Sequence, residues 1–153
     1  WVTTMHNIQI LQEAFDPSTE ISHLSRANAS MGAVVSFIGM MRDINEGDEV
    51  ESMTLEHYPG MTESAINKIV EQAQQRWQLG NVTVIHRVGK VRPTDPIVLV
   101  AVTSMHRGEA FKACEFIIDF LKTEAPFWKK EQTGRGERWV EARDSDRDKL
   151  SDW

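Results

Sequence analysis

The sequence predicts an α+β fold built mainly from antiparallel strands. Apolar residues recur at helical spacing in two long segments, whereas other segments alternate or form continuous β-branched runs. These strands and helices do not follow a strict β–α–β alternation, which argues against a parallel doubly wound sheet. The 153 residues, 41% hydrophobic and 26% charged, predict a single domain over 1–153. Met5 is a candidate natural start, in which case Trp1–Thr4 precede the native chain.

Helix signals predict three helices. Asp16 followed by Pro17 is typical of a helix start, because Asp caps the first turn and Pro suits the first helical position. Two later segments carry an apolar stripe at helical spacing, and Gly80 is interpreted as the stop of the first of these. The three helices are expected at Pro17–Ala27, Thr62–Trp77 and Arg107–Thr123.

Strand signals fill the remaining segments. The apolar, β-branched run Gly32–Met41 is typical of a buried strand, and Ile97–Thr103 of a central one. The polar stretch Asp43–Glu51 is rich in acids, so we expect a mobile surface loop. The other strands are expected at Ile8–Leu11, Ser52–Tyr58 and Val82–Val88, and in a hairpin of Phe127–Gln132 and Arg138–Ala142 around Gly134–Gly136.

Composition excludes several classes of protein. A net charge of −6 argues against a general nucleic-acid binder, and neither a membrane span nor a secretion signal is visible. The single cysteine, Cys114, leaves no internal disulfide and favours a reducing, cytoplasmic compartment. Cys114 lies on an apolar helix stripe, so we interpret it as a core residue. The histidines lack metal-ligand spacing, so no metal site is expected.

Positive charge is concentrated late in the chain. Residues 106–143 carry a net charge of +1, whereas 1–105 carry −5 and 144–153 carry −2. An acidic protein that gathers cations in one segment is a candidate for binding a small anion there. Arg42 and Arg143, which follow predicted strands, could add guanidinium groups for phosphate or carboxylate, although each alone is more typical of a surface residue.

His106 and Arg107 stand at the expected start of a helix. A helix N-terminus carries partial positive charge and unpaired N–H groups, so two more cations are unfavourable there unless an anion joins them. A solvated pair that tolerates its position is the alternative. The spacing alone leaves both interpretations open.

Lysines follow at the other end of this helix. Lys122 stands in its last turn, where a cation also simply complements the helix dipole. On the next strand Lys129 and Glu131 share one face, whereas Lys130 points the other way. A fold that brings Lys122 and Lys129 together would favour a neutral amine, the form that acts as base or nucleophile.

Several ordered segments closely resemble the large, catalytic subunit of the molybdopterin synthase family. The resemblance covers nearly the whole chain from about Gly32 and is weaker before it. It implies an α/β hammerhead fold with an additional small antiparallel β-sheet. The matching segments are GAVVSFIGMMR (32–42), LEHYPGMTE (55–63), TVIHRVG (83–89), TSMHRGEAF (103–111), FLKTEAPFWKKE (120–131) and RWVEARDSD (138–146).

The family resemblance also implies partners and a reaction. Its members form a homodimer within a heterotetramer, in which each end binds a small ubiquitin-like sulfur carrier. The C-terminal Gly-Gly thiocarboxylate of the carrier enters a pocket on the large subunit. Two such sulfurs convert cyclic pyranopterin monophosphate into molybdopterin, forming its dithiolene. The resemblance implies no cofactor or metal, and no nucleic acid or membrane as a partner.

Carried over by position, the family's functional residues fall on the cations described above. Lys122 and Lys129 are the implied catalytic residues: Lys122 as a proton-transfer group or transient amine, and Lys129 as a stabiliser of developing negative charge. At Met40 some relatives have a lysine, so any charge contact from that side chain is absent here, whereas a backbone contact could survive. The implied substrate-binding residues are Met40, Met41, Arg42, His106, Arg107, Lys122, Lys129, Lys130, Glu131 and Arg143.

Two other functions compete with this one. A non-catalytic adaptor would bind a ubiquitin-like carrier without chemistry, but it has no need of the cationic residues Lys122, Lys129 and Arg42. A phosphate-sensing module would bind ordinary nucleotides tightly and ignore a pterin phosphate.

Overall fold

A four-stranded sheet and the helices on its two faces form the larger part of the described chain. The computed structural model describes residues 5–140 and 144–153, with side chains for 6–140 and 147–153. The strand order is β1-β5-β7-β2; β1 is parallel to β5, and the other pairs are antiparallel. The strands are β1 (Met5–Leu11), β2 (Ala33–Met40), β5 (Asn81–Arg87) and β7 (Pro96–Ser104).

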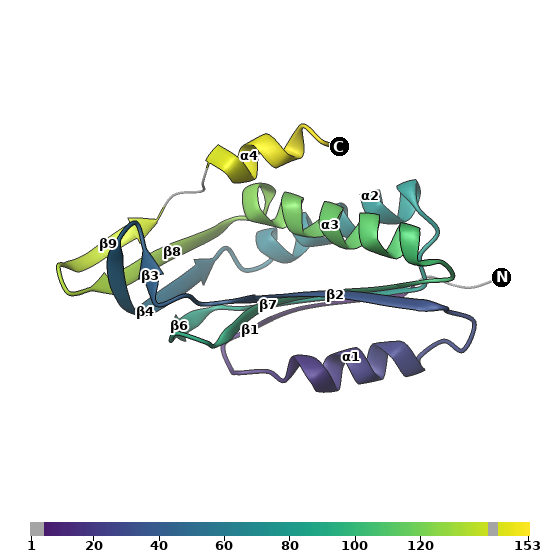
Figure 1. Cartoon of the computed structure of the whole chain (residues 1–153), viewed down its shortest axis with the longest axis horizontal. Helices are drawn as coiled ribbons and strands as arrows, with labels where there is room; N and C mark the ends of the chain where they lie inside the picture. Colours follow the sequence, from purple (N-terminus) through teal and green to yellow (C-terminus); the bar gives the residue numbers. More distant parts are fainter. Residues whose placement is uncertain (1–4, 141–143) are drawn as a thin grey trace.

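Helices cover both faces of this sheet (Figure 1). α1 (Pro17–Arg26) lies on one face, and Asp16 caps it by accepting a hydrogen bond from the Ser18 N–H, as expected. α2 (Met61–Arg76) and α3 (Arg107–Glu124) lie on the other face. The larger core lies between these two helices and the sheet, and includes Ile66, Val70, Val100, Phe116 and Ile117.

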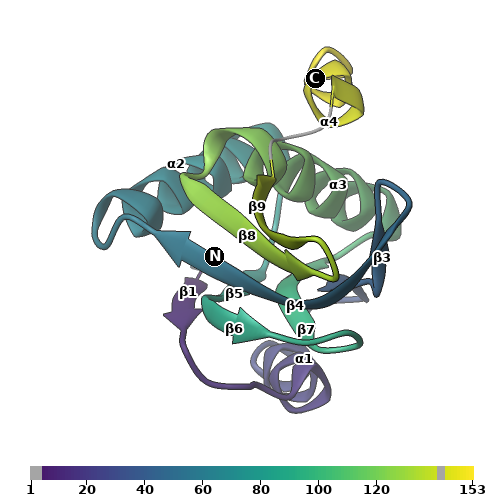
Figure 2. The same cartoon turned by 90° about the vertical axis from the view of Figure 1, so that its left-hand side faces the viewer.

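A second sheet crosses one end of the first (Figure 2). Its order is β3-β4-β8-β9, and β6 pairs with the other edge of β4. A smaller apolar cluster, containing Val50, Met53, Leu55 and Val91, lies beneath it. The two sheets agree with the expected hammerhead and its additional small sheet. The strands are β3 (Ile44–Asn45), β4 (Asp48–His57), β6 (Gly89–Val91), β8 (Phe127–Thr133) and β9 (Gly136–Val140).

The C-terminal segment returns to the helical layer. α4 (Asp144–Leu150), which was not predicted, leads to Trp153. The Trp153 ring makes edge contacts with Trp77 and Phe116, and its Nε1 donates a 2.8 Å hydrogen bond to Asp119. This contact fastens the chain end to α2 and α3. None of the described helices is both long and apolar enough to cross a membrane.

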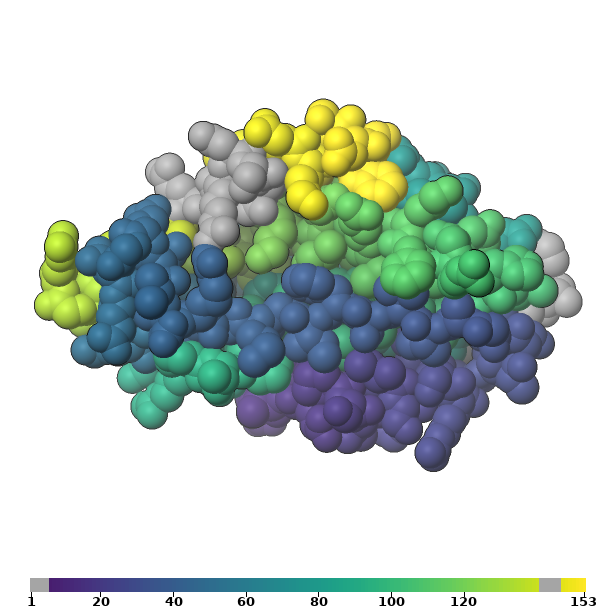
Figure 3. Space-filling view, viewed as in Figure 1, coloured from purple at the N-terminus to yellow at the C-terminus, as the bar shows by residue number. Residues whose placement is uncertain are grey.

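The expectation that 32–41 forms a buried strand is wrong for this chain. β2 is the edge of its sheet, and Val34, Phe37 and Ile38 are each more than a third exposed. The space-filling view shows this segment as a strip along the surface between α1 and α3 (Figure 3). A continuous apolar run does not distinguish a strand buried within one chain from an edge strand with an uncovered apolar face.

Two local expectations also need correction. The supposed loop 43–51 contains β3 and the start of β4, which pair through a turn at Glu46 and Gly47; both have positive φ, as a type I′ hairpin requires. Gly80 does not stop α2, which ends at Arg76. Gly80 instead lies against β7, where its N–H donates to the Thr103 carbonyl and a Cβ would lie 2.5 Å from Thr103 Oγ1. Residues 1–4 and the last predicted residues of the hairpin, 141–142, lie outside the described part.

Candidate functional site

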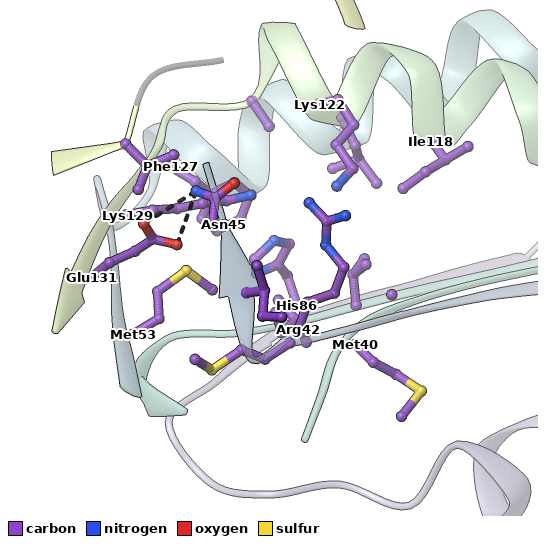
Figure 4. A pocket seen from close by; sticks show the side chains of 18 residues that line it. Met40, Arg42, Asn45, Met53, His86, Ile118, Lys122, Phe127, Lys129 and Glu131 are labelled. Atoms are coloured by element: carbon purple, nitrogen blue, oxygen red, sulfur yellow. Dashed lines mark hydrogen bonds between the residues drawn. The ribbon is translucent and has the colours of Figure 1, made fainter. Parts of the chain in front are cut away.

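A cavity of about 290 Å³ lies at the junction of the two sheets (Figure 4). The end of β2, β3, the inner faces of β4 and β8, and the C-terminal turn of α3 surround it. Its apolar lining includes Met53, Ile97, Leu121 and Phe127. Segments more than 80 residues apart in the sequence therefore build one concave site.

Three cationic side chains of the described residues line the cavity. Arg42 follows β2 just beyond a register irregularity at Gly39/Met40, and its guanidinium extends into the cavity. Lys122 reaches it from the last turn of α3, and Lys129 from the inward face of β8. The structure thus brings Lys122 and Lys129 to one cavity, the juxtaposition that the sequence hypothesis required.

Glu131 is the carboxylate among the described residues that line the cavity, and Asn45 and Arg138 hold it. It is only 5% exposed and accepts two 3.1 Å hydrogen bonds from Asn45 Nδ2 and one of 3.0 Å from Arg138 Nε. Arg138 also donates 2.8 Å hydrogen bonds to Asp48 and to the main-chain oxygen of Asn45. These contacts fix the β3–β4 hairpin against β8 and β9, so that Asn45 forms part of the cavity wall.

Sequence reasoning missed Asn45 and Arg138. For Arg138 a signal was available, because the predicted hairpin brings residue 138 within one position of Glu131, and the observed register pairs these two residues directly. Nothing local marks Asn45, because its partner Glu131 lies 86 residues away.

His86 is a further cavity residue without an assigned role. It is 8% exposed, and its ring stacks on Phe127 with 3.7 Å between centroids. Nδ1 lies 2.8 Å from the Arg87 carbonyl oxygen, which can only accept, so Nδ1 carries the proton. Burial, together with the smaller effect of the positive charges of Lys129 and Lys122, lowers the pKa of His86 to about 3. The imidazole is therefore neutral at physiological pH.

Several expected site residues are not at this cavity within one chain. Lys130 faces the opposite side of β8 and forms a 2.8 Å ion pair with Glu137. His106 caps α3 and Arg107 begins it, so both lie at the far end of the helix from Lys122. Fifteen residues at 1.5 Å each put about 23 Å between the two ends.

The other expected residues divide between the cavity and the undescribed part. Met40 and Met41 both line the cavity, the first 53% exposed and the second buried. Arg143 lies outside the described residues. Cys114 is confirmed as a core residue: burial raises the pKa of its thiol to about 12, and Sγ lies 3.7 Å from the Val100 carbonyl.

The charge and shape of the cavity indicate its ligand class. Among the described lining residues, Arg42, Lys122 and Lys129 are cationic, and the carboxylate, Glu131, is also engaged by Arg138. The apolar lining provides a surface for a flat ring. The described residues contain no cluster of three His, Cys, Asp or Glu side chains arranged to hold a metal ion. A small anion that carries a planar heterocycle fits these properties.

Comparison with known proteins gives consistent matches. Residues 10–124 match the family described as MoaE protein. The chain is 59% identical over 149 residues to the molybdopterin synthase catalytic subunit of Ralstonia nicotianae, covering 97% of this chain and 85% of the relative. It is 56% identical to the subunit of the same name from Haemophilus influenzae, covering 95% and 97%. A solved structure, the molybdopterin biosynthesis MoaE protein from Burkholderia ambifaria, superposes with a TM-score of 0.84 at 49% identity and covers 97% of this chain and 98% of its own.

Proposed function

The chain belongs to the MoaE protein family, and from this membership we propose that it is the catalytic subunit of a molybdopterin synthase. This sulfurtransferase of molybdenum cofactor biosynthesis acts with a small ubiquitin-like sulfur-carrier subunit. It transfers two sulfurs from the carrier's C-terminal thiocarboxylate to cyclic pyranopterin monophosphate. The observation that carries the proposal is the cavity that gathers Arg42, Lys122 and Lys129 in a chain of this family.

The geometry supports a division of roles within the cavity. Arg42, at the open end of β2, is suited to the substrate phosphate, because a guanidinium binds phosphate through paired hydrogen bonds. Lys122 is the proton-transfer group or transient amine at the carbon that the thiocarboxylate sulfur attacks. Lys129 stabilises the negative charge that develops there. The sulfur comes from the carrier, since Cys114 is buried in the core.

A homodimer would give His106 and Arg107 a place in the site. β2 runs from the His106 end of the molecule to the cavity end at Met40. At the His106 end, the Gly32 N–H donates a hydrogen bond to the Ser104 carbonyl. Its eight residues span about 26 Å, close to the length of α3 between Arg107 and Lys122. Two copies paired antiparallel along their exposed β2 edges would therefore bring the partner's His106 and Arg107 beside Arg42.

Reconstitution tests the proposed reaction. The protein is mixed with a thiocarboxylated Gly-Gly carrier and cyclic pyranopterin monophosphate, and the pterin product is followed by mass. We expect a gain of two sulfurs that depends on Lys122. Carrier binding without any sulfur transfer by the wild-type protein would overturn the proposal and favour a non-catalytic adaptor in the cytoplasm.

Mixed dimers test the shared site. Lys122→Ala and Arg107→Ala variants are each expected to be inactive, but a dimer of one with the other has one site with both residues intact. Random mixing should restore about a quarter of wild-type activity, since half of the dimers are mixed and each has one intact site. Without such recovery, Arg107 would not act across the dimer.

A further inference from the structure

His86 is the one neutral imidazole among the cationic side chains of the described cavity. Arg42, Lys122 and Lys129 all line the same space, and all three side chains donate hydrogen bonds but accept none in their charged forms. A ligand held by these groups alone would be recognised through its anionic and carbonyl oxygens. Its N–H groups would need acceptors from elsewhere in the wall.

The carboxylate acceptor of the described wall, Glu131, is already occupied. Both carboxylate oxygens of Glu131 accept from Asn45, and one also accepts from Arg138. His86 differs, because its Nδ1 proton is used on the Arg87 carbonyl while Nε2 has no hydrogen-bond partner among the described residues. In this tautomer Nε2 carries a lone pair and can only accept.

The structure holds this imidazole in one orientation and one charge state. The stack on Phe127 and the bond to Arg87 fix the plane and the direction of the ring. Burial, with Lys129 and Lys122 nearby, keeps it neutral, since its pKa is about 3. A bound proton would place a further cation beside these lysines, so Nε2 remains an acceptor throughout the physiological range.

We propose that His86 is a specificity-determining residue whose Nε2 accepts a hydrogen bond from an N–H group of the substrate's pterin ring. This inference rests on the proposed function, because it takes a reduced pterin phosphate as the ligand. A reduced pterin displays several N–H donors around its rings, while its phosphate can be held by the cations. His86 thereby makes the cavity bind the pterin phosphate in preference to inorganic phosphate and to other anions without such donors.

Three substitutions distinguish a hydrogen bond accepted by Nε2 from the packing of the His86 ring. His86→Gln puts an amide oxygen near the position of Nε2 and keeps an acceptor. His86→Asn keeps a donor near Nδ1 for the Arg87 carbonyl but removes the acceptor at Nε2. His86→Phe keeps a ring to stack on Phe127 and removes both nitrogens.

The test uses the complex of the protein with its carrier subunit and is carried out under anaerobic conditions. KM and kcat for sulfur transfer are measured for each variant, together with the dissociation constants of cyclic pyranopterin monophosphate and inorganic phosphate. We expect His86→Asn and His86→Phe to raise KM and the pterin dissociation constant about tenfold, with kcat and phosphate affinity nearly unchanged, since one neutral hydrogen bond is lost. His86→Gln should stay within about threefold of the wild type.

Two results would overturn the assignment. Equal pterin affinity in His86→Asn and the wild type would show that Nε2 makes no contact. Parallel losses of pterin and phosphate affinity in all three variants would show that His86 acts only through packing. Failure of the proposed function would give a different result from failure of the His86 assignment. In that case the wild-type complex and all three variants would transfer no sulfur.

Discussion

The buried neutral imidazole of His86 predicts a specific acid sensitivity of the fold. In the unfolded chain His86 has the ordinary histidine pKa of about 6.5, whereas burial lowers the folded value to about 3. Between these values the unfolded state binds a proton that the folded state does not, so stability falls as the pH is lowered through 6.5. The contribution is complete above about pH 7.

The size of this effect follows from the two pKa values. At pH 5 the His86 term lowers the free energy of unfolding by about 2 kcal/mol relative to pH 8. For a chain of this length, about 2 kcal/mol corresponds to a fall of about 4–8 °C in Tm. Lys129, Lys122 and His57 are the charged or titratable groups that act on His86, and all three oppose its protonation.

Urea unfolding of the wild type and His86→Phe from pH 5 to pH 8 checks the prediction. All other titratable groups are common to the two proteins, so the difference between the two stability curves isolates His86. We expect the wild type to lose about 2 kcal/mol more than the variant across this range. Two parallel curves would refute the reasoning, because His86 would then have the same pKa in the folded and unfolded states.

Three further outcomes follow from the cavity and the core. Lys122→Ala should lower kcat for sulfur transfer by about 10²–10⁴-fold with carrier affinity intact, whereas Lys112→Ala, on the exposed face of the same helix, should match the wild type. Arg138→Gln should raise KM for the pterin about tenfold, because it loosens the β3–β4 hairpin. Arg135→Gln is the matched control, since the Arg135 side chain is 83% exposed. Equal KM values in the two variants would contradict the role of Arg138. Cys114→Ala should keep full sulfur transfer, and the native thiol should react with a thiol reagent only after unfolding; rapid labelling of the folded protein would show that Cys114 is accessible.

Local signals in the sequence were sufficient for most of the fold. The cap at Asp16, the apolar stripes of α2 and α3, and the β-branched run of β7 each determine an element through contacts within a few residues. The β3–β4 hairpin was missed because its acidic turn at Glu46 and Gly47 resembles a loop in composition. α4 was missed because its anchor, Trp153, depends on Trp77 and Phe116, which are distant in the sequence.

The site, like the fold, contains residues that the sequence indicated and residues that only tertiary contacts bring to the cavity. The concentration of charge late in the chain indicated an anion site, and the lysines Lys122 and Lys129 do meet at one cavity. The expected helix already placed His106 and Lys122 at opposite ends of α3, and the length of that helix keeps His106 away from the cavity within one chain. Asn45 and His86 join the cavity only through tertiary contacts, so no local pattern identified them.

The unequal sizes of the two larger core clusters give the molecule a graded resistance to local unfolding. Fifteen buried residues form the described core between the main sheet, α2 and α3, whereas seven form the core beneath β4, β6 and β8. Amide hydrogens of β8 and β9 should therefore exchange with solvent through partial opening, while those of β5 and β7 exchange only when the whole chain unfolds. Because the cavity is lined by both sheets, a bound ligand would reduce the difference in exchange rates between them. The slowing of exchange should be greatest in the smaller sheet.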